Sequence, residues 1–326
     1  MHNKISISTI RRALGLATLL APLAAGAGGF PAKPVQIVVP FGAGSITDVV
    51  ARVIAEHMRE GLGQPVIVEN KPGVGGIVGA ANVAKAPADG YTLLLGSNST
   101  NAINQSLFKS LPYDPIKDLV PVSMAGEIPA VMIARADHRA NTLQDVVDLA
   151  KAAPGRLTFG IGNTTNRVAG EMLQKAGKFE AVIVPYRGEP YGLTDLLGGQ
   201  VDFMFLNLPV AYPHLQTGKV KAIALTGVRR VSAMPSIPVA GETLAGFSMP
   251  DGWLAFFAPA GTPPQIIRRL NEEIVAALDD AEVRKRLEAT GGYVVKSSTP
   301  DELGERVASD AKRWADLIKA ANIPLQ

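Results

Sequence analysis

The sequence repeats one order of segments: a short apolar run, a turn rich in glycine and hydroxyl residues, and a helical stretch. Residues 35–39 form the first apolar run, 41–45 the turn and 49–59 the helical stretch. Further apolar runs occupy 65–70, 91–95, 157–160, 182–186 and 201–205. Continuous apolar strands that alternate with helices indicate parallel sheets covered by helices on both faces. The order therefore predicts an α/β protein, with a more helical final third over 264–321.

The first 27 residues have the pattern of a secretory signal peptide. Lys4, Arg11 and Arg12 precede an apolar run over 13–25, and residues 25–27 read Ala-Gly-Ala. A basic segment, an apolar segment and a small-residue site in this order predict export and cleavage after Ala27. The apolar run is shorter than the ~20 residues of a membrane span, which disfavours the alternative of an uncleaved anchor. We therefore expect a periplasmic protein.

Cleavage after Ala27 would leave 299 of the 326 residues. A single hydrophobic core stops growing efficiently at ~250–300 residues, so a chain of this size is expected to form two lobes. The whole chain carries 32 basic and 29 acidic residues. Three of the basic residues and no acidic residue lie within 1–27, so the remaining chain has 29 of each and a formal charge of zero. This balance argues against a nucleic-acid partner.

Cofactor and enzyme signals are poor. The chain has no cysteine, which excludes disulfides, thiol nucleophiles and cysteine-bound metals. The glycine-rich segment 73–79 has valine at position 78, where a dinucleotide fingerprint needs glycine. Ser45 and Ser99 lack the Gly-x-Ser-x-Gly pattern of a hydrolase nucleophile, and no histidine pair has metal-ligand spacing. We expect no cofactor, no metal and no catalytic residue, although a periplasmic serine hydrolase stays as an alternative.

Three turns between strands and helices share one chemistry. Residues 44–47, 97–100 and 162–165 combine small residues with Ser, Thr or Asn directly before a helical stretch. The first turn of a helix offers free N–H groups and a partial positive charge, and ligands of open α/β sheets bind at the carboxyl ends of strands. Three such turns brought together would form an anion-binding cleft. For any one turn ordinary helix capping is the favoured interpretation, and the presence of three similar turns favours a shared pocket.

Motifs along the whole mature chain resemble those of the Bug family, the extracytoplasmic solute receptors of tripartite tricarboxylate transporters. The first is PFGAGSITDVVAR at 40–52, and APADGYTL at 86–93 is very typical of the family. The others are ENKPGVGG at 69–76, VPYRG at 184–188, DLLGGQVD at 195–202 and FAPAGTP at 257–263. Each motif is modest alone, but their order and spacing are specific.

The resemblance implies a type II periplasmic-binding-protein fold, with two α/β lobes around a hinged ligand cleft. Lobe one would comprise residues 28–125 and 228–326, and lobe two residues 126–227. The crossings would lie near Ala125-Gly126 and Thr226-Gly227, where glycine suits a hinge. The implied function is capture of a small carboxylate and its delivery to integral membrane subunits of the transporter, by a receptor that acts as a monomer. A ligand sensor for a membrane kinase would need the same two lobes and stays open.

The family holds ligand carboxylates with backbone amides, hydroxyls and bridging waters from loops between the lobes. Carried to matching positions, the implied ligand contacts are Phe41, Ala43, Ser45, Thr47, Asp48, Asn98, Thr100, Asn101, Asn163, Thr164, Thr165, Arg187, Gly188 and Asn207.

Two positions depart from the family pattern. Ser45 stands where a second glycine is common, which adds a hydroxyl beside the expected carboxylate. Leu206 stands where members often have Asp, an acid that can meet the amine of an amino-acid ligand. We therefore expect a mono- or dicarboxylate with an apolar far end, either aromatic or aliphatic, in preference to an amino acid.

Overall fold

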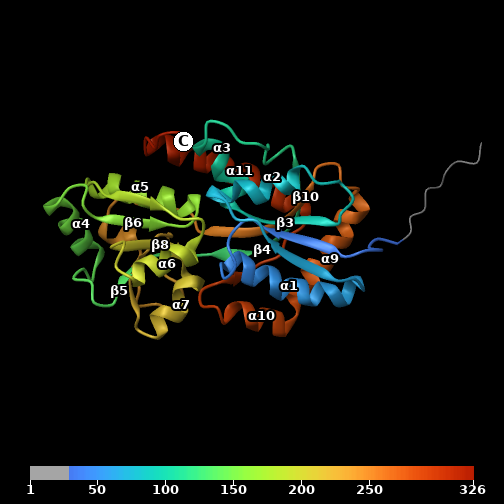
Figure 1. The fold of residues 1–326 in the computed structure, drawn as a ribbon, viewed down its shortest axis with the longest axis horizontal. Helices are drawn as coiled ribbons and strands as arrows, with labels where there is room; N and C mark the ends of the chain where they lie inside the picture. Colours follow the sequence, from blue (N-terminus) through green and yellow to red (C-terminus); the bar gives the residue numbers. More distant parts are fainter. Residues whose placement is uncertain (1–28) are drawn as a thin grey trace, which may run out of the picture.

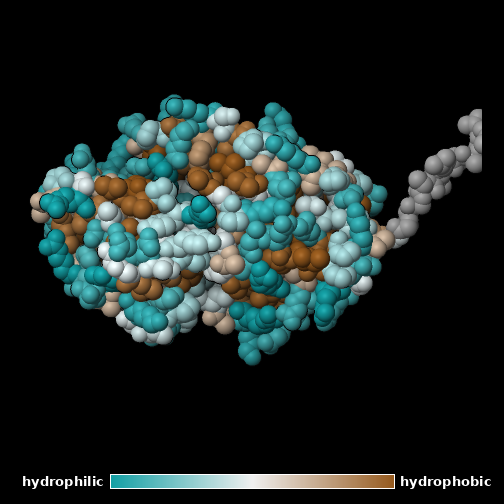
Figure 2. Space-filling model, viewed as in Figure 1, coloured by the Kyte–Doolittle hydropathy of each residue, from teal (hydrophilic) through white to brown (hydrophobic). Residues whose placement is uncertain are grey.

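The computed structural model describes residues 29–326, and its two β-sheets lie side by side along the long axis of the molecule, each between helices (Figure 1). This arrangement confirms the predicted α/β class. The predicted signal peptide, residues 1–27, lies outside the described residues, so its cleavage stays a prediction. On the face seen in Figure 2, apolar residues form separate patches among hydrophilic ones. None of the helices between residues 29 and 326 combines the length and the apolar character that a bilayer span requires.

The first sheet has six strands in the order β11-β4-β10-β3-β1-β2. Its strands are β1 (Val35–Val39), β2 (Val66–Asn70), β3 (Thr92–Ser97), β4 (Leu119–Ile128), β10 (Gly252–Pro259) and β11 (Val294–Val295). Strands β1, β2 and β3 pair in parallel, whereas β10 runs antiparallel to β3 and β4. The predicted parallel pairing therefore holds for the N-terminal strands, and the returning chain adds an antiparallel strand.

Helices cover both faces of this sheet because side chains alternate along each strand. Ile37 packs with α1 and α9 on one face, and Val38 packs with α2 and α11 on the other. Both residues are fully buried. The helical elements of this half are α1 (Ile46–Leu62), η1 (Val74–Gly76), α2 (Ile77–Ala84), η2 (Ser99–Ile103), α3 (Asn104–Leu107), α9 (Pro264–Asp279), α10 (Ala281–Glu288) and α11 (Pro300–Ala320).

The second sheet has five strands in the order β7-β6-β8-β5-β9. The strands are β5 (Ala130–Arg135), β6 (Thr158–Ile161), β7 (Val182–Pro185), β8 (Phe203–Asn207) and β9 (Val220–Leu225). The helices are α4 (Leu143–Ala152), α5 (Thr164–Gly177), α6 (Glu189–Leu197), α7 (Leu208–Gln216) and α8 (Ala240–Thr243). Phe203 and Phe205 pack with α4 and α5 on one face, and Leu206 packs with α6 and α7 on the other.

The chain changes sheet at two places that differ in detail from the predicted crossings. Ala125 and Gly126 lie inside β4, and the first change follows at Pro129, between β4 and β5. After β9, Val239 forms a parallel bridge with Leu225, and α8 packs against α4. The segment around α8 thus packs with the second sheet, although the predicted lobe division assigns residues 228–326 to lobe one. The chain rejoins the first sheet at β10.

Candidate functional site

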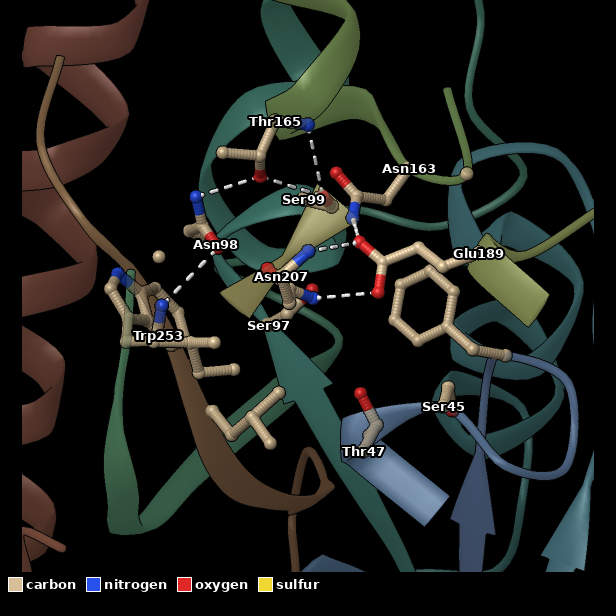
Figure 3. Close-up of a pocket in the computed structure, with 15 residues that line it drawn as sticks. Ser45, Thr47, Ser97, Asn98, Ser99, Asn163, Thr165, Glu189, Asn207 and Trp253 are labelled. Carbon is tan, nitrogen blue, oxygen red and sulfur yellow. Dashed lines mark hydrogen bonds between the residues drawn. The ribbon is translucent and has the colours of Figure 1, made fainter. Parts of the chain in front are cut away.

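A cavity lies where the carboxyl ends of strands from both sheets face each other (Figure 3). Only about 20 Å³ is accessible to the centre of a water molecule, which is room for about one water. Residues from the β1–α1, β3–η2, β6–α5 and β8–α7 turns, the N-terminus of α6 and strands β4 and β10 line it. They are Phe41, Ser45, Thr47, Ser97, Asn98, Ser99, Ile128, Gly162, Asn163, Thr165, Glu189, Asn207, Gly252, Trp253 and Leu254.

The turn before α1 contributes two hydroxyls to the cavity. Ser45 is the N-cap of α1, and its Oγ accepts a hydrogen bond from the Asp48 backbone N–H at 3.3 Å. This bond uses one of the two acceptor lone pairs of the hydroxyl and leaves its O–H available. The Thr47 hydroxyl makes no hydrogen bond with any described residue, and Figure 3 shows it pointing into the cavity. This turn therefore caps α1 and also lines the cavity.

Asp48 shapes the same turn from outside the cavity. Its Oδ2 accepts from the Gly44 N–H at 3.0 Å, and its Oδ1 lies 2.8 Å from the Arg52 guanidinium. Burial alone would raise the pKa of Asp48, but hydrogen bonds from Arg52, Gly44 and Asn70 hold that pKa below its usual value. Asp48 therefore stays ionised and paired with Arg52, and it does not line the cavity.

Direct hydrogen bonds join the two halves beside the cavity. Asn98 Nδ2, which follows β3, donates to Thr165 Oγ1 at 2.9 Å, and Ser99 Oγ lies 3.0 Å from the same oxygen. Thr165 belongs to the first turn of α5 in the other half, and its N–H donates to Ser99 Oγ at 3.3 Å. These contacts bring the predicted second and third turns together, with the two halves in contact.

Three further predicted residues hold the turns without lining the cavity. Thr100 Oγ1 accepts from the Ser97 N–H at 2.9 Å and donates to Asn101 Oδ1 at 2.6 Å. Thr164 Oγ1 donates to Asn104 Oδ1 at 2.8 Å, which adds a second link between the halves. Thr100, Asn101 and Thr164 are buried, so their contacts fix the backbone of the cavity-lining turns.

In the second sheet's half, two predicted asparagines bind the carboxylate of Glu189. Asn163 caps α5 by accepting from the Asn166 N–H at 2.8 Å, and its Nδ2 donates to Glu189 Oε1 at 2.9 Å. Asn207 donates its backbone N–H to Oε1 at 2.8 Å and its Nδ2 to Oε2 at 3.2 Å. Asn166 Nδ2 adds a bond of 2.8 Å to Oε1. Burial raises the pKa of Glu189 to about 7, against the lowering effect of these donors.

Gly162 packs closely against the backbone of Glu189 and so helps to fix the position of Glu189. A side chain at Gly162 would bring its Cβ to 2.4 Å from the Glu189 backbone nitrogen, so the turn after β6 needs glycine here. Gly188 is the N-cap of α6 and packs near Gly42 of the other half, without lining the cavity. Ala43 and Arg187 are exposed and lie outside the cavity lining.

The structure thus gathers seven of the fourteen predicted contacts around the cavity, which are Phe41, Ser45, Thr47, Asn98, Asn163, Thr165 and Asn207. Glu189 is missing from the prediction, although an acid directly after the Gly188 turn was a visible signal. The β10 residues Gly252, Trp253 and Leu254 are also missing, because β10 carries no turn chemistry.

Leu206 has a different place from the one that the sequence interpretation gave it. It is fully buried among the core residues under α6 and α7. Alternation along β8 sends Leu206 into the core and leaves Asn207 at the cavity. Leu206 therefore gives no apolar lining, and the apolar part of the wall comes from Phe41, Ile128 and β10.

The lining chemistry suits binding of a polar solute. No histidine lines the cavity, and neither Ser45 nor Ser99 is hydrogen-bonded to an imidazole among residues 29–326. Over the same residues, no group of three or more His, Asp or Glu side chains is arranged to hold a metal ion. Hydroxyls, amides and the N-termini of α1 and α5 are instead the groups that hydrogen-bond an anionic or polar ligand.

Two α/β lobes that enclose a polar cavity at their strand ends define a two-lobe solute-binding protein. Solved periplasmic binding proteins share this fold over almost the whole described chain. Residues 50–323 match the family described as "Tripartite tricarboxylate transporter family receptor". The chain belongs to this family, which confirms the resemblance found in the motifs.

Individual relatives are similar over nearly their full lengths. Protein BugT of Bordetella pertussis is 35% identical over 316 residues, which cover 96% of each chain. The structure of Rhodopseudomonas palustris MatC with bound malate is 34% identical, has a TM-score of 0.84, and is matched over 89% of this chain and 100% of its own. The R. palustris Rpa4515 structure with adipate is 29% identical, has a TM-score of 0.87, and is matched over 91% and 100%.

Proposed function

We propose that the protein is a periplasmic receptor that binds a small carboxylate between its lobes and delivers it to integral membrane subunits of a tripartite tricarboxylate-type transporter. The family assignment supports the delivery step. The malate and adipate in two structural relatives support a carboxylate ligand. The proposal includes export by the predicted signal peptide, action as a monomer and binding without catalysis or a cofactor.

The observation that carries this proposal is the set of free donors at the cavity. The Thr47 hydroxyl has no protein partner among the described residues, and the Ser45 O–H is available beside it. Both belong to the N-terminus of α1, whose N–H groups attract negative charge. Asn98 and Thr165 add polar groups from both lobes. A carboxylate is the common solute group that accepts several such bonds at once.

The small volume of the cavity implies that the lobes part when a ligand enters. Space for about one water cannot hold a dicarboxylate, so the bonds of Thr165 to Asn98 and Ser99 describe a closed form. We place the hinge at Pro129, Thr226 and the segment before Gly252, where the chain passes between the sheets. Ligand binding then shifts the equilibrium between open and closed forms.

Isothermal titration calorimetry tests the proposal with carboxylic acids and their neutral primary amides. Binding of an acid with no binding of its amide would support the carboxylate as the recognised group. Thr47→Val removes the free hydroxyl with little change in shape and should weaken binding of the acid. Thr290→Val is the matched control in lobe one, because its hydroxyl bonds only the Leu287 carbonyl outside the cavity. Equal binding of acids and amides would contradict the proposal.

A further inference from the structure

Among residues 29–326, Glu189 is the only charged side chain that lines the cavity. It is 3% exposed and begins α6, and Figure 3 shows its carboxylate between Asn163 and Asn207, directed into the cavity. A buried charge without a cation beside it is rare in proteins, and it usually marks a function. Four N–H groups in lobe two bind this carboxylate, and none of them carries a formal charge.

The two oxygens of Glu189 differ in what they can still accept. Oε1 accepts three hydrogen bonds, from Asn163, Asn166 and Asn207. Oε2 accepts one, from Asn207 Nδ2 at the longer distance of 3.2 Å. A carboxylate oxygen has about two acceptor sites, so Oε2 has capacity for one more donor. The donors present are all N–H groups, which fit an ionised carboxylate better than a protonated one, since a protonated acid needs an acceptor for its own O–H.

The cavity wall opposite Glu189 offers hydrogen-bond donors instead of a negatively charged acceptor. Ser45 and Thr47 of lobe one offer O–H donors and no negative charge, and they stand at the N-terminus of α1. A ligand carboxylate is favoured at this wall and is repelled beside Glu189. The cavity therefore has a donor end and an acceptor end, and a ligand that satisfies both must carry an acceptor group and a donor group.

We infer that Glu189 is a specificity-determining residue that selects carboxylates carrying a hydroxyl or a protonated amine, whose donor reaches Oε2. This inference rests on the proposed function, since it concerns the ligand of the same cavity. It revises the expectation, drawn from Leu206, that an amino-acid ligand is disfavoured: Glu189 supplies an acid from another strand-to-helix turn. A carboxylate without such a donor leaves the remaining acceptor site of Oε2 buried and unfilled when the lobes close, which costs affinity.

The protonation of Glu189 gives the inference a second, independent readout. Burial raises its pKa to about 7, so a donor from the ligand favours the ionised form and releases a proton near neutral pH. A ligand carboxylate beside Glu189 would do the reverse and take up a proton. The other charged or titratable groups at this end of the surrounding elements are Asp48 and Arg52 on α1, Arg167 on α5, and Arg187 and Tyr191 beside Glu189. None of them is a histidine, and His214 lies in the last turn of α7, away from Asn207.

Calorimetry with matched acids tests the inference on the full-length protein. The sets are succinate, malate and aspartate; glutarate, 2-hydroxyglutarate and glutamate; and phenylacetate, mandelate and phenylglycine. In each set the members differ only in carrying hydrogen, hydroxyl or amine on one carbon. For the set that binds, we expect the hydroxy or amino acid to bind roughly 10- to 150-fold more tightly than the parent acid, as for one hydrogen bond to a charged group.

Glu189→Gln keeps the shape and removes the charge, and it should reduce that preference by about fivefold or more, because bonds to a charged acceptor are about twice as strong as neutral ones. The amino acid should lose more than the hydroxy acid. Glu180→Gln is the matched control, because Glu180 is an exposed acid of the same lobe outside the cavity. Melting temperatures show whether each variant is folded.

The pH dependence of binding can be measured on the wild-type protein alone. The preferred acid should bind more tightly to the wild-type protein at pH 8 than at pH 6. Parent acids that bind as tightly as their hydroxy and amino forms, or affinity that falls from pH 6 to pH 8, would overturn the inference and leave the proposed function standing. Failure of every carboxylate to bind would instead contradict the proposed function.

Discussion

Removal of the Thr165 hydroxyl is the perturbation that most directly tests the role of lobe contacts in ligand binding. Thr165 Oγ1 accepts from Asn98 Nδ2 at 2.9 Å and lies 3.0 Å from Ser99 Oγ, and both partners belong to the other lobe. Thr165→Val replaces the hydroxyl with a methyl group of similar size. The variant keeps the backbone bond from the Thr165 N–H to Ser99 Oγ, so the start of α5 should keep its position.

The expected magnitude follows from the two lost bonds. A neutral hydrogen bond contributes about 0.5–1.5 kcal/mol net, so the closed form should lose about 1–3 kcal/mol relative to the open form. Because each 1.4 kcal/mol is tenfold, the affinity for a ligand that binds the closed form should fall by about 5- to 150-fold. The stability of the separate lobes should change little, since neither bond lies within one lobe.

Calorimetry of the tightest-binding carboxylate measures the affinity, and small-angle scattering without ligand measures the shift toward the open form. Thr217→Val is the control, because Thr217 is exposed on the same lobe and bonds only carbonyls of α7. A double-mutant cycle with Ser99→Ala separates the Ser99 contribution. An affinity within twofold of wild type, with no coupling to Ser99, would refute the reasoning that these bonds hold the closed form.

Three further outcomes are expected. Ser45→Ala removes both the N-cap of α1 and a cavity hydroxyl. Chemical denaturation should therefore show a loss of about 1 kcal/mol in unfolding free energy, and calorimetry should show a carboxylate affinity weaker by about 0.5–1.5 kcal/mol. An unchanged affinity would remove Ser45 from the binding site. The pKa of Glu189 is raised from 4.5 to about 7, so its protonated form stabilises the fold at low pH. This contribution, of order 3 kcal/mol, is lost as pH rises through about 7. Chemical denaturation from pH 5 to 8 should show the loss in the wild-type protein and not in Glu189→Gln. Asp310→Ala leaves the buried Trp253 indole N–H unpaired, where it now donates at 2.7 Å, so thermal unfolding should show a loss of about 1–3 kcal/mol, and a smaller change would mean that water replaces the carboxylate.

The α/β class and the sites of the strand-to-helix turns could be predicted because they depend on local patterns. The apolar run at 35–39 and the cap at Ser45 are both short-range signals, and the structure has β1 and α1 there. Strand β10 was not predicted, and its antiparallel pairing depends on a chain return far along the sequence.

The cavity was predicted only in part, since a turn shows which groups it offers and not where they point. Thr100 and Asn101 have the same chemistry as Asn98, yet their side chains bond each other inside η2. The sequence shows an acid after the Gly188 turn but not its hydrogen bonds, because the partners of Glu189 lie in two other turns, after β6 and after β8. Burial and partner geometry of this kind are properties of the fold.

A crystal structure of the protein with its tightest-binding carboxylate tests the central claim most directly. The account predicts a closed form with the ligand carboxylate within hydrogen-bond distance of Ser45 or Thr47, and with other ligand atoms in contact with residues of the second lobe. A carboxylate bound outside the cleft, or held by one lobe alone, would contradict it.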